Sequence, residues 1–210
     1  MVDMVLEIRE LRKSDYNKVI DFAIKGMHFD WYIENKLIRR LYGRYFLYLE
    51  MLKATHIMAA YDGEELAGVL MCEMKGRKPI HSSLWQSCYV KFVDFLQQTF
   101  VKEGVGPYDA VNKKMLEDYK KKHNPDGEIV FLAADPDSKV KGVGTFLLNE
   151  LEKREAGKTI YLYTDTGCTY QFYERRGFER VGDEPITIQL GKNNIDIRCL
   201  LYSKTFTNEA

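Results

Sequence analysis

The stretch GEIVFLAADPDSKVKGVGTF, residues 127–146, decides the fold that we predict for this chain of 210 residues. Its first part, residues 129–134, is a continuous apolar run, which is typical of an interior strand buried on both faces. Asp135-Pro136 ends the run, and an amphipathic helix is predicted to begin near Gly142. The stretch therefore predicts a buried strand, a glycine-bearing loop and a helix in direct succession.

The loop between this strand and helix has the composition of an anion-binding site. Gly142 and Gly144 allow a ligand to approach the backbone closely, and the helix begins with free N–H groups at the positive end of its dipole. Lys139 and Lys141 add positive charge, so the loop suits a pyrophosphate. The Gly-Lys-Ser/Thr sequence of a P-loop is absent, and Leu147 replaces the third glycine of the dinucleotide fingerprint.

The segments on either side of the loop predict further strands and helices. Asp62-Gly63 between two apolar runs predicts a hairpin, and Ser14 is a suitable N-cap for the first helix. The helical pattern of residues 31–53 contains Gly43, where we expect a kink or a break. Its tyrosine and phenylalanine side chains are expected to pack in the core. The predicted strands are residues 5–9, 55–61, 65–74, 185–190 and 195–202, with a further strand that ends at residues 180–183, and two further helices cover residues 84–100 and 110–122. After the helix that follows the loop, TIYLYTDTGCTYQFYERRGF predicts a second central strand and then a short helix.

Composition excludes several classes of protein. Thirty-one basic residues balance thirty-one acidic ones, which gives no electrostatic reason to expect nucleic-acid or membrane binding. The four cysteines and four histidines show no ligand spacing, so we expect free thiols and no metal. The N-terminus does not resemble a signal peptide, and no apolar run is long enough to span a membrane. A cytoplasmic protein is the expectation.

Two motifs together resemble those of the GCN5-related N-acetyltransferase (GNAT) family. Lys139-x-x-Gly142-x-Gly144 is similar to the family's pyrophosphate loop, Q/R-x-x-G-x-G/A, and FYERRGF at residues 172–178 is similar to its second signature. The resemblance implies an α/β (α+β) fold with a mixed, mostly antiparallel sheet of six to seven strands. It also implies helices on both faces and a splay between strands four and five. Residues 1–210 would form a single domain with a helical insertion at residues 76–124.

The same resemblance implies acetyl-CoA as co-substrate, with no metal. The pantetheine arm would pair with the fourth strand, and the pyrophosphate would bind the backbone N–H groups of the loop. The strand residues concerned are Leu132, Ala133 and Ala134, and the loop residues are Lys139, Val140, Lys141, Gly142, Val143, Gly144 and Thr145. Thr166 stands where the family often has an asparagine that contacts the cofactor arm, so its role is in doubt.

The resemblance also implies which residues transfer protons during the reaction. Tyr173 matches the tyrosine that protonates the departing thiolate in many members, although it could instead only pack or hydrogen-bond the cofactor. Glu128 has the position of the catalytic glutamate in the histone-acetylating branch, and the alternatives are a solvent-facing carboxylate or a water chain as base.

The acceptor is not fixed by the fold. Aromatic residues in the first helices and the insertion suggest a walled pocket that favours a small amine. These residues are Trp31, Tyr32, Trp85, Tyr89 and Tyr108. A protein or peptide N-acetyltransferase and a non-catalytic acyl-CoA sensor are the alternatives, and a homodimer is common in the family.

Overall fold

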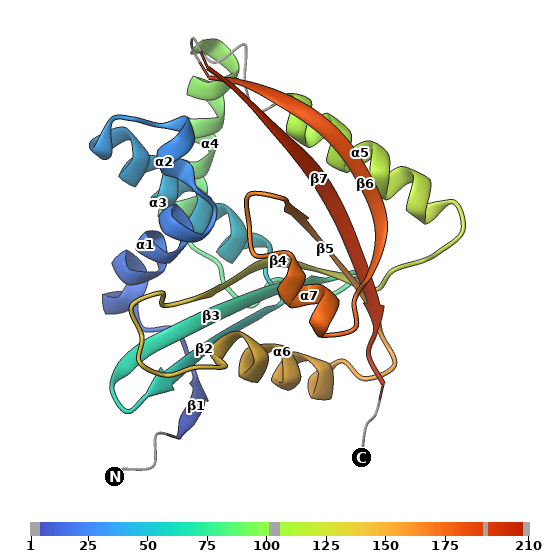
Figure 1. The fold of residues 1–210 in the computed structure, drawn as a ribbon. Coiled ribbons are helices and arrows are strands. Elements are labelled where there is room, and N and C mark those ends of the chain that lie inside the picture. The colour runs from blue at the N-terminus through green and yellow to red at the C-terminus, as the bar shows by residue number, and fades with distance from the viewer. Residues whose placement is uncertain (1–4, 101–105, 191–192, 208–210) are drawn as a thin grey trace.

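A seven-stranded sheet organises the computed structural model, which describes residues 5–100, 106–190 and 193–207. The strand order is β1-β2-β3-β4-β5-β7-β6 (Figure 1). All neighbouring strands are antiparallel except β4 and β5, which are parallel. The strands are β1 (Leu6–Arg9), β2 (His56–Asp62), β3 (Glu65–Met74), β4 (Gly127–Ala134), β5 (Thr159–Asp165), β6 (Glu179–Leu190) and β7 (Asn193–Thr205). The predicted mixed sheet is confirmed.

Helices cover both faces of the sheet. In Figure 1, α6 lies below the sheet, and α1, α3 and α5 lie above it. The lower core is formed by α6, from which Leu147, Leu148 and Leu151 are fully buried. The helices are α1 (Tyr16–Gly26), α2 (Phe29–Tyr32), α3 (Lys36–Lys53), α4 (Leu84–Phe100), α5 (Gly106–Lys120), α6 (Val143–Arg154) and α7 (Gln171–Arg175), with a 3₁₀ turn at Lys13–Asp15.

β4 and β5 separate soon after they begin. They pair only where Gly127 faces Ile160 and Glu128 faces Tyr161, so the predicted splay is confirmed. The expectation that residues 129–134 are buried on both faces is wrong for their second half. Leu132 and Ala133 are half-buried and Ala134 is exposed, because β5 has turned away from this edge. The ladder with β3 is irregular at Val130, which has no partner residue across it.

Two details of the first helices differ from the prediction. The cap of α1 is Asp15 and not Ser14, and no side chain of the described residues caps it. The helical pattern breaks before Lys36 and not at Gly43, because the Asn35 side chain accepts hydrogen bonds from two N–H groups of α3. Gly43 lies inside α3, where an added Cβ would stand 2.9 Å from Ile20 Cγ2. The glycine therefore allows α1 and α3 to pack closely.

The later elements follow the prediction more closely. α4 has the predicted bounds, and α5 begins at Gly106, earlier than expected, because Pro107 suits the first turn of a helix. The Gly-Val part of the break at residues 104–105 lies outside the described residues. The two predicted strands on either side of Glu184 form one strand, β6, with an irregularity at Val181. Within the described residues, no helix is long and apolar enough to cross a membrane.

Candidate functional site

The N-terminus of α6 is open. Its cap residue, Gly142, has a φ of 80°, in the left-handed region that favours glycine, and an added Cβ would meet nothing within 4 Å. No side chain of the described residues caps this end, so its N–H groups remain available to a ligand. At Gly144 an added Cβ would stand 3.4 Å from the Phe172 ring. This glycine allows α7 to lie against α6, which brings the two motifs together.

The loop before α6 is fixed by its own polar groups. The Asp135 N–H donates to the Ala67 carbonyl at 2.7 Å, and the Asp135 carboxylate lies 3.0 Å from Lys18 Nζ. The Ser138 hydroxyl accepts a hydrogen bond from the Val140 N–H at 3.1 Å. Lys139 and Lys141 are exposed and have no ion-pair partner among the described residues, so their charges are available to an anion.

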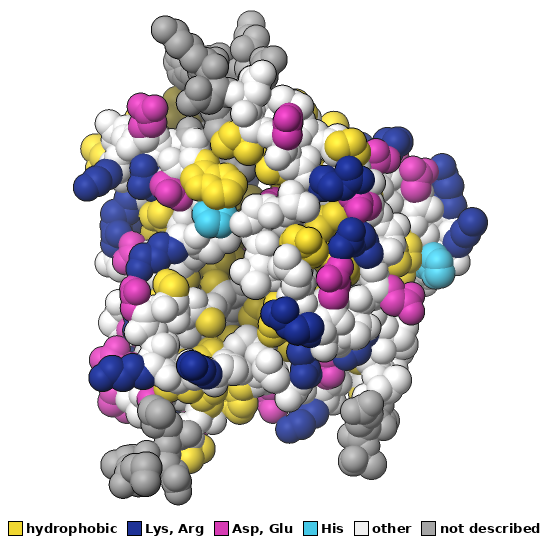
Figure 2. Space-filling model, viewed as in Figure 1, with side chains coloured by type: hydrophobic (Ala, Val, Ile, Leu, Met, Phe, Trp, Pro, Cys, Tyr) yellow, Lys and Arg dark blue, Asp and Glu magenta, His cyan; other side chains and the backbone are white. Residues whose placement is uncertain are grey.

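A small pocket adjoins this loop. Its volume is about 280 Å³, and it lies between the loop and the β2–β3 turn. It is lined by Lys18, Asp62, Glu65, Leu66, Ala67, Asp135, Asp137, Ser138, Lys139 and Val140. Separately, Figure 2 shows a hollow with hydrophobic side chains at its floor, between the places of α1 and α7 in Figure 1. The hollow lies above α6, where β4 and β5 diverge.

Tyr173 lies on α7 among aromatic side chains. Its ring packs edge-on against Phe172 and Phe178, with centroid distances of 5.3 and 5.8 Å. Burial raises the pKa of the phenol well above its usual range. Its hydroxyl makes no hydrogen bond to another described residue. The hydroxyl is therefore a protonated donor with no partner inside the described part of the chain.

Glu128 is held at the point where the splay begins. The Tyr161 hydroxyl donates a hydrogen bond to its carboxylate at 2.8 Å. Burial raises the pKa of the Glu128 carboxyl, and the hydrogen bond from Tyr161 opposes that shift. The side chain is thus held in a fixed geometry and does not lie free in solvent. Burial therefore makes this carboxylate a stronger proton acceptor than an exposed one.

Glu128 and Tyr173 occupy different faces of the sheet. Tyr173 packs against the core formed by α6, whereas Tyr161, the partner of Glu128, packs in the cluster formed with α5. A molecule held between β4 and β5 would have Glu128 on one side and Tyr173 on the other. This arrangement suits removal of a proton on one face and donation of a proton on the other.

Thr166 takes part in sheet pairing. Its N–H donates to the Arg198 carbonyl, and its hydroxyl accepts from the Arg198 N–H, both at 3.1 Å. Both groups therefore continue the β5–β7 ladder. Contact between Thr166 and a cofactor stays a prediction.

Two of the five predicted pocket aromatics lie beside the end of β5 and the loop that follows it. The Trp31 ring stacks on His28 and lies 3.0 Å from where a Cβ would stand on Gly167. The Tyr108 hydroxyl donates to Asp165 at 3.1 Å. The other three behave differently. Trp85 is 71% exposed, Tyr89 donates to the Leu41 carbonyl, and the Tyr32 side chain lies outside the described residues.

The sequence interpretation missed Glu50. This residue lies on α3 and is only 8% exposed, and burial raises the pKa of its carboxyl to about 7. A signal was present, because Glu50 falls three residues after Leu47 on the buried stripe of the helix. A carboxylate in an apolar stripe is unusual enough to be a functional candidate.

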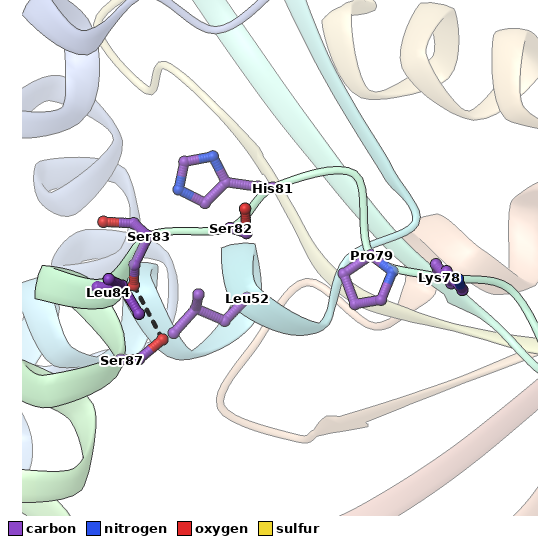
Figure 3. Close-up of a pocket in the computed structure, with 8 residues that line it drawn as sticks. All are labelled: Leu52, Lys78, Pro79, His81, Ser82, Ser83, Leu84 and Ser87. Carbon is purple, nitrogen blue, oxygen red and sulfur yellow. Dashed lines mark hydrogen bonds between the residues drawn. The ribbon is translucent and has the colours of Figure 1, made fainter.

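A second, larger pocket lies away from the motifs. Figure 3 shows it between the end of α3 and the start of α4, with a volume of about 580 Å³. On the α4 side of the pocket, the Ser87 hydroxyl donates a 2.9 Å hydrogen bond to the Ser83 carbonyl. None of its lining residues belongs to either motif. The lining residues are Leu52, Lys78, Pro79, His81, Ser82, Ser83, Leu84 and Ser87.

Metal and thiol chemistry find little support in the described residues. No three or more potential metal ligands gather anywhere in this part of the chain. All four cysteines are free, and burial raises the pKa of Cys168 to about 12, which disfavours the reactive thiolate.

Comparison with known proteins agrees with this geometry. Residues 104–178 match the model of the acetyltransferase (GNAT) family, and no curated protein gave a match. The chain is similar to a histone acetyltransferase HPA2 and related acetyltransferase from Corynebacterium glutamicum, with 16% identity, a TM-score of 0.57, and 97% and 98% of the two chains covered. It is also similar to PaiA N-acetyltransferase from Thermoplasma acidophilum in complex with coenzyme A, with 17% identity, a TM-score of 0.53, and 97% and 100% coverage.

A third similar structure is Arabidopsis thaliana NAA60 in complex with a bisubstrate analogue, with 13% identity, a TM-score of 0.52, and 98% and 100% coverage. These identities are low, so the structures support the fold alone. The chain has the fold of the GNAT acetyltransferases, and the resemblance predicted from its two motifs is confirmed. The family match begins at residue 104 and thus includes α5, in the segment predicted as an insertion.

Proposed function

We propose that this protein transfers the acetyl group of acetyl-CoA to a primary amine of a small molecule. The observation that carries the proposal is the splay of β4 and β5, which leads to the open N-terminus of α6. Backbone N–H groups and two exposed lysines at that end suit the pyrophosphate of coenzyme A. The free edge of β4 at Leu132, Ala133 and Ala134 suits the amides of the pantetheine arm.

The chain's own residues divide the proton transfers between two faces. The thioester supplies an activated acetyl group, and the amine nitrogen forms a C–N bond to its carbonyl carbon as the C–S bond breaks. The Glu128 carboxylate takes the proton that the amine loses. The Tyr173 hydroxyl gives a proton to the departing sulfur, whose electron pair would otherwise remain as a buried thiolate.

The experiment that tests the proposal measures free thiol released from acetyl-CoA with a panel of small amines, amino acids and peptides. Thiol release that depends on a small amine is the expected result. Activity on peptides alone would contradict the small acceptor. Binding of coenzyme A without thiol release on any acceptor would instead identify an acyl-CoA-binding module.

Replacing both Lys139 and Lys141 by Ala should weaken coenzyme A binding by about tenfold, because two exposed ion pairs contribute about 1 kcal/mol or less each. The loss should shrink at high salt, since exposed charges are screened. Isothermal titration calorimetry at low and high salt checks this. Ala replacements at Lys113 and Lys122, two exposed lysines on and just after α5, serve as the control. Equal affinity in both double variants would place the pyrophosphate elsewhere.

Glu128→Gln should lower kcat about a hundredfold if the carboxylate is the general base. In the wild type, kcat should rise with pH as Glu128 loses its proton, above the ordinary carboxyl range because its pKa is raised. The amide cannot titrate, so this limb of the pH profile should disappear. Stopped-assay pH profiles of both proteins check the expectation. A variant that keeps both rate and profile would point to a water chain as base.

A further inference from the structure

The exposed face of α4 is apolar. Over residues 84–96, whose side chains the structure describes, this face is formed by Leu84, Trp85, Cys88, Lys91, Phe92 and Phe95. Leu84 is 89% exposed, and the three aromatic side chains are 59–71% exposed. Lys91 is the one charged residue among the six. A surface helix normally turns charged and polar residues toward water, so this face has the composition of one that another surface covers.

The opposite side of α4 already packs against α3. Val90 is 6% exposed, and the Tyr45 hydroxyl of α3 donates a 2.6 Å hydrogen bond to Asp94. The Tyr89 hydroxyl donates to the Leu41 carbonyl at 3.0 Å. In Figure 1, α4 lies beside α3 and away from α6. Packing within the chain therefore accounts for one side of α4 and leaves the apolar face toward solvent.

The area of this face is large for a monomer. Its three aromatic side chains together expose roughly 300–500 Å², because each such side chain presents about 150–250 Å². Leu84 and the neighbouring Ile80, which is 63% exposed, add to it. The largest apolar patch of a typical monomer is about 300–600 Å². The face thus reaches the top of that range and extends toward the roughly 800 Å² that each partner buries in a stable interface.

A pocket lies at the N-terminal end of the same face. This is the cavity of about 580 Å³ between α3 and α4, and Figure 3 shows Leu52 of α3 pointing toward Leu84 and Ser87 of α4 in its wall. Phe92 lies eight residues after Leu84, about 12 Å further along the helix. An aromatic ring is the side chain that most often fills a pocket at an interface. The face therefore carries a cavity at one end and exposed rings at the other.

A twofold axis across the middle of α4 exchanges these two ends. We propose that the exposed face of α4 binds the same face of a second copy of the chain, with the two α4 helices antiparallel and Phe92 of each copy seated in the pocket of the other. The match is self-complementary, because the cavity and the ring that fills it both belong to one face. A face with a single charged residue also brings little like-charge repulsion against its own copy.

Charge favours a second copy over a lipid surface. A helix that binds an anionic membrane carries basic residues around its apolar face. The exposed face of α4 has Lys91 alone, and the 31 basic residues of the chain are balanced by 31 acidic ones. Arg77, in the segment that leads to the pocket, is held by Glu155 through hydrogen bonds of 2.6 and 2.8 Å. Its charge is therefore already compensated within the chain.

Sedimentation velocity over a range of protein concentrations tests the pairing. The wild type should form a dimer, and Phe92→Asp should raise the dissociation constant about a hundredfold or more, because each dimer carries the change twice. Val5→Asp is the matched control, since Val5 is 62% exposed and lies just before β1. Circular dichroism of Phe92→Asp should match that of the wild type. A wild type that is monomeric at every concentration, or equal dimerisation in both variants, would overturn the proposal.

Cys88 shows which face forms the dimer. It lies between the pocket and Phe92, so antiparallel helices packed about 8–10 Å apart bring the two Cys88 thiols within roughly 10 Å. Cys72 and Cys199 are buried and Cys168 is half-buried. A short bismaleimide should therefore cross-link the wild-type dimer and should not cross-link Cys88→Ser. A dimer without this cross-link would place the interface elsewhere and overturn the proposal. Binding of a monomer to phosphatidylserine vesicles would overturn it in favour of a membrane.

Discussion

Tyr173→Phe should lower kcat for acetyl transfer about a hundredfold and leave the affinity for coenzyme A nearly unchanged. A positioned general acid contributes about 10²–10⁴-fold, and the lower end applies because a thiolate is a good leaving group. The ring contacts to Phe172 and Phe178 involve no hydroxyl, so they survive the substitution. The raised pKa of the phenol keeps the proton available over the whole working range of pH.

The measurements are steady-state kinetics of thiol release and calorimetry of coenzyme A binding. Tyr170→Phe is the matched control, because Tyr170 lies at the start of the same helix and its ring faces Arg180. A packing role for Tyr173 predicts unchanged kcat and unchanged thermal stability, because the phenylalanine ring keeps the same contacts. A catalytic role predicts a lower kcat at unchanged thermal stability. Undiminished kcat in Tyr173→Phe would exclude the hydroxyl as the proton donor.

The features that the sequence predicted correctly are those determined by residues close to one another in the chain. Gly142 at the start of α6 and the Asp62-Gly63 turn both follow from local conformational preferences. The expected burial of β4 failed because it depends on where β5 goes, which no local pattern records. Glu50 was missed although its helical spacing from Leu47 was visible, because its burial depends on how α3 packs in the folded chain.

The helix starts were predicted wrongly where two nearby residues could each cap or interrupt the helix. Ser14 and Asp15 are both good N-caps, and a 3₁₀ turn at Lys13–Asp15 moves the start of α1 onward by one position. α3 begins directly after Asn35 because the Asn35 side chain accepts hydrogen bonds from two N–H groups at once, and the helix does not break at Gly43. Gly43 is a close-packing residue against Ile20, and a sequence pattern cannot separate that role from a helix break.

Glu50→Gln should stabilise the protein by about 3 kcal/mol at pH 9 and have little effect at pH 4. Burial, with the charges of Glu128 and Glu73, raises the pKa of the carboxyl from 4.5 to about 7, although Lys53 opposes the shift. Because the folded state holds this proton more tightly than the unfolded state, stability is greatest below pH 4.5 and falls as pH rises through 7. A tenfold change in proton affinity corresponds to about 1.4 kcal/mol, and glutamine cannot ionise.

Urea unfolding at both pH values checks this, with the exposed Glu34→Gln as control. Equal stability of wild type and Glu50→Gln at pH 9 would show that the carboxylate is already compensated, for example by Lys53. A gain would mean that the chain retains a destabilising charge, as expected of a binding group.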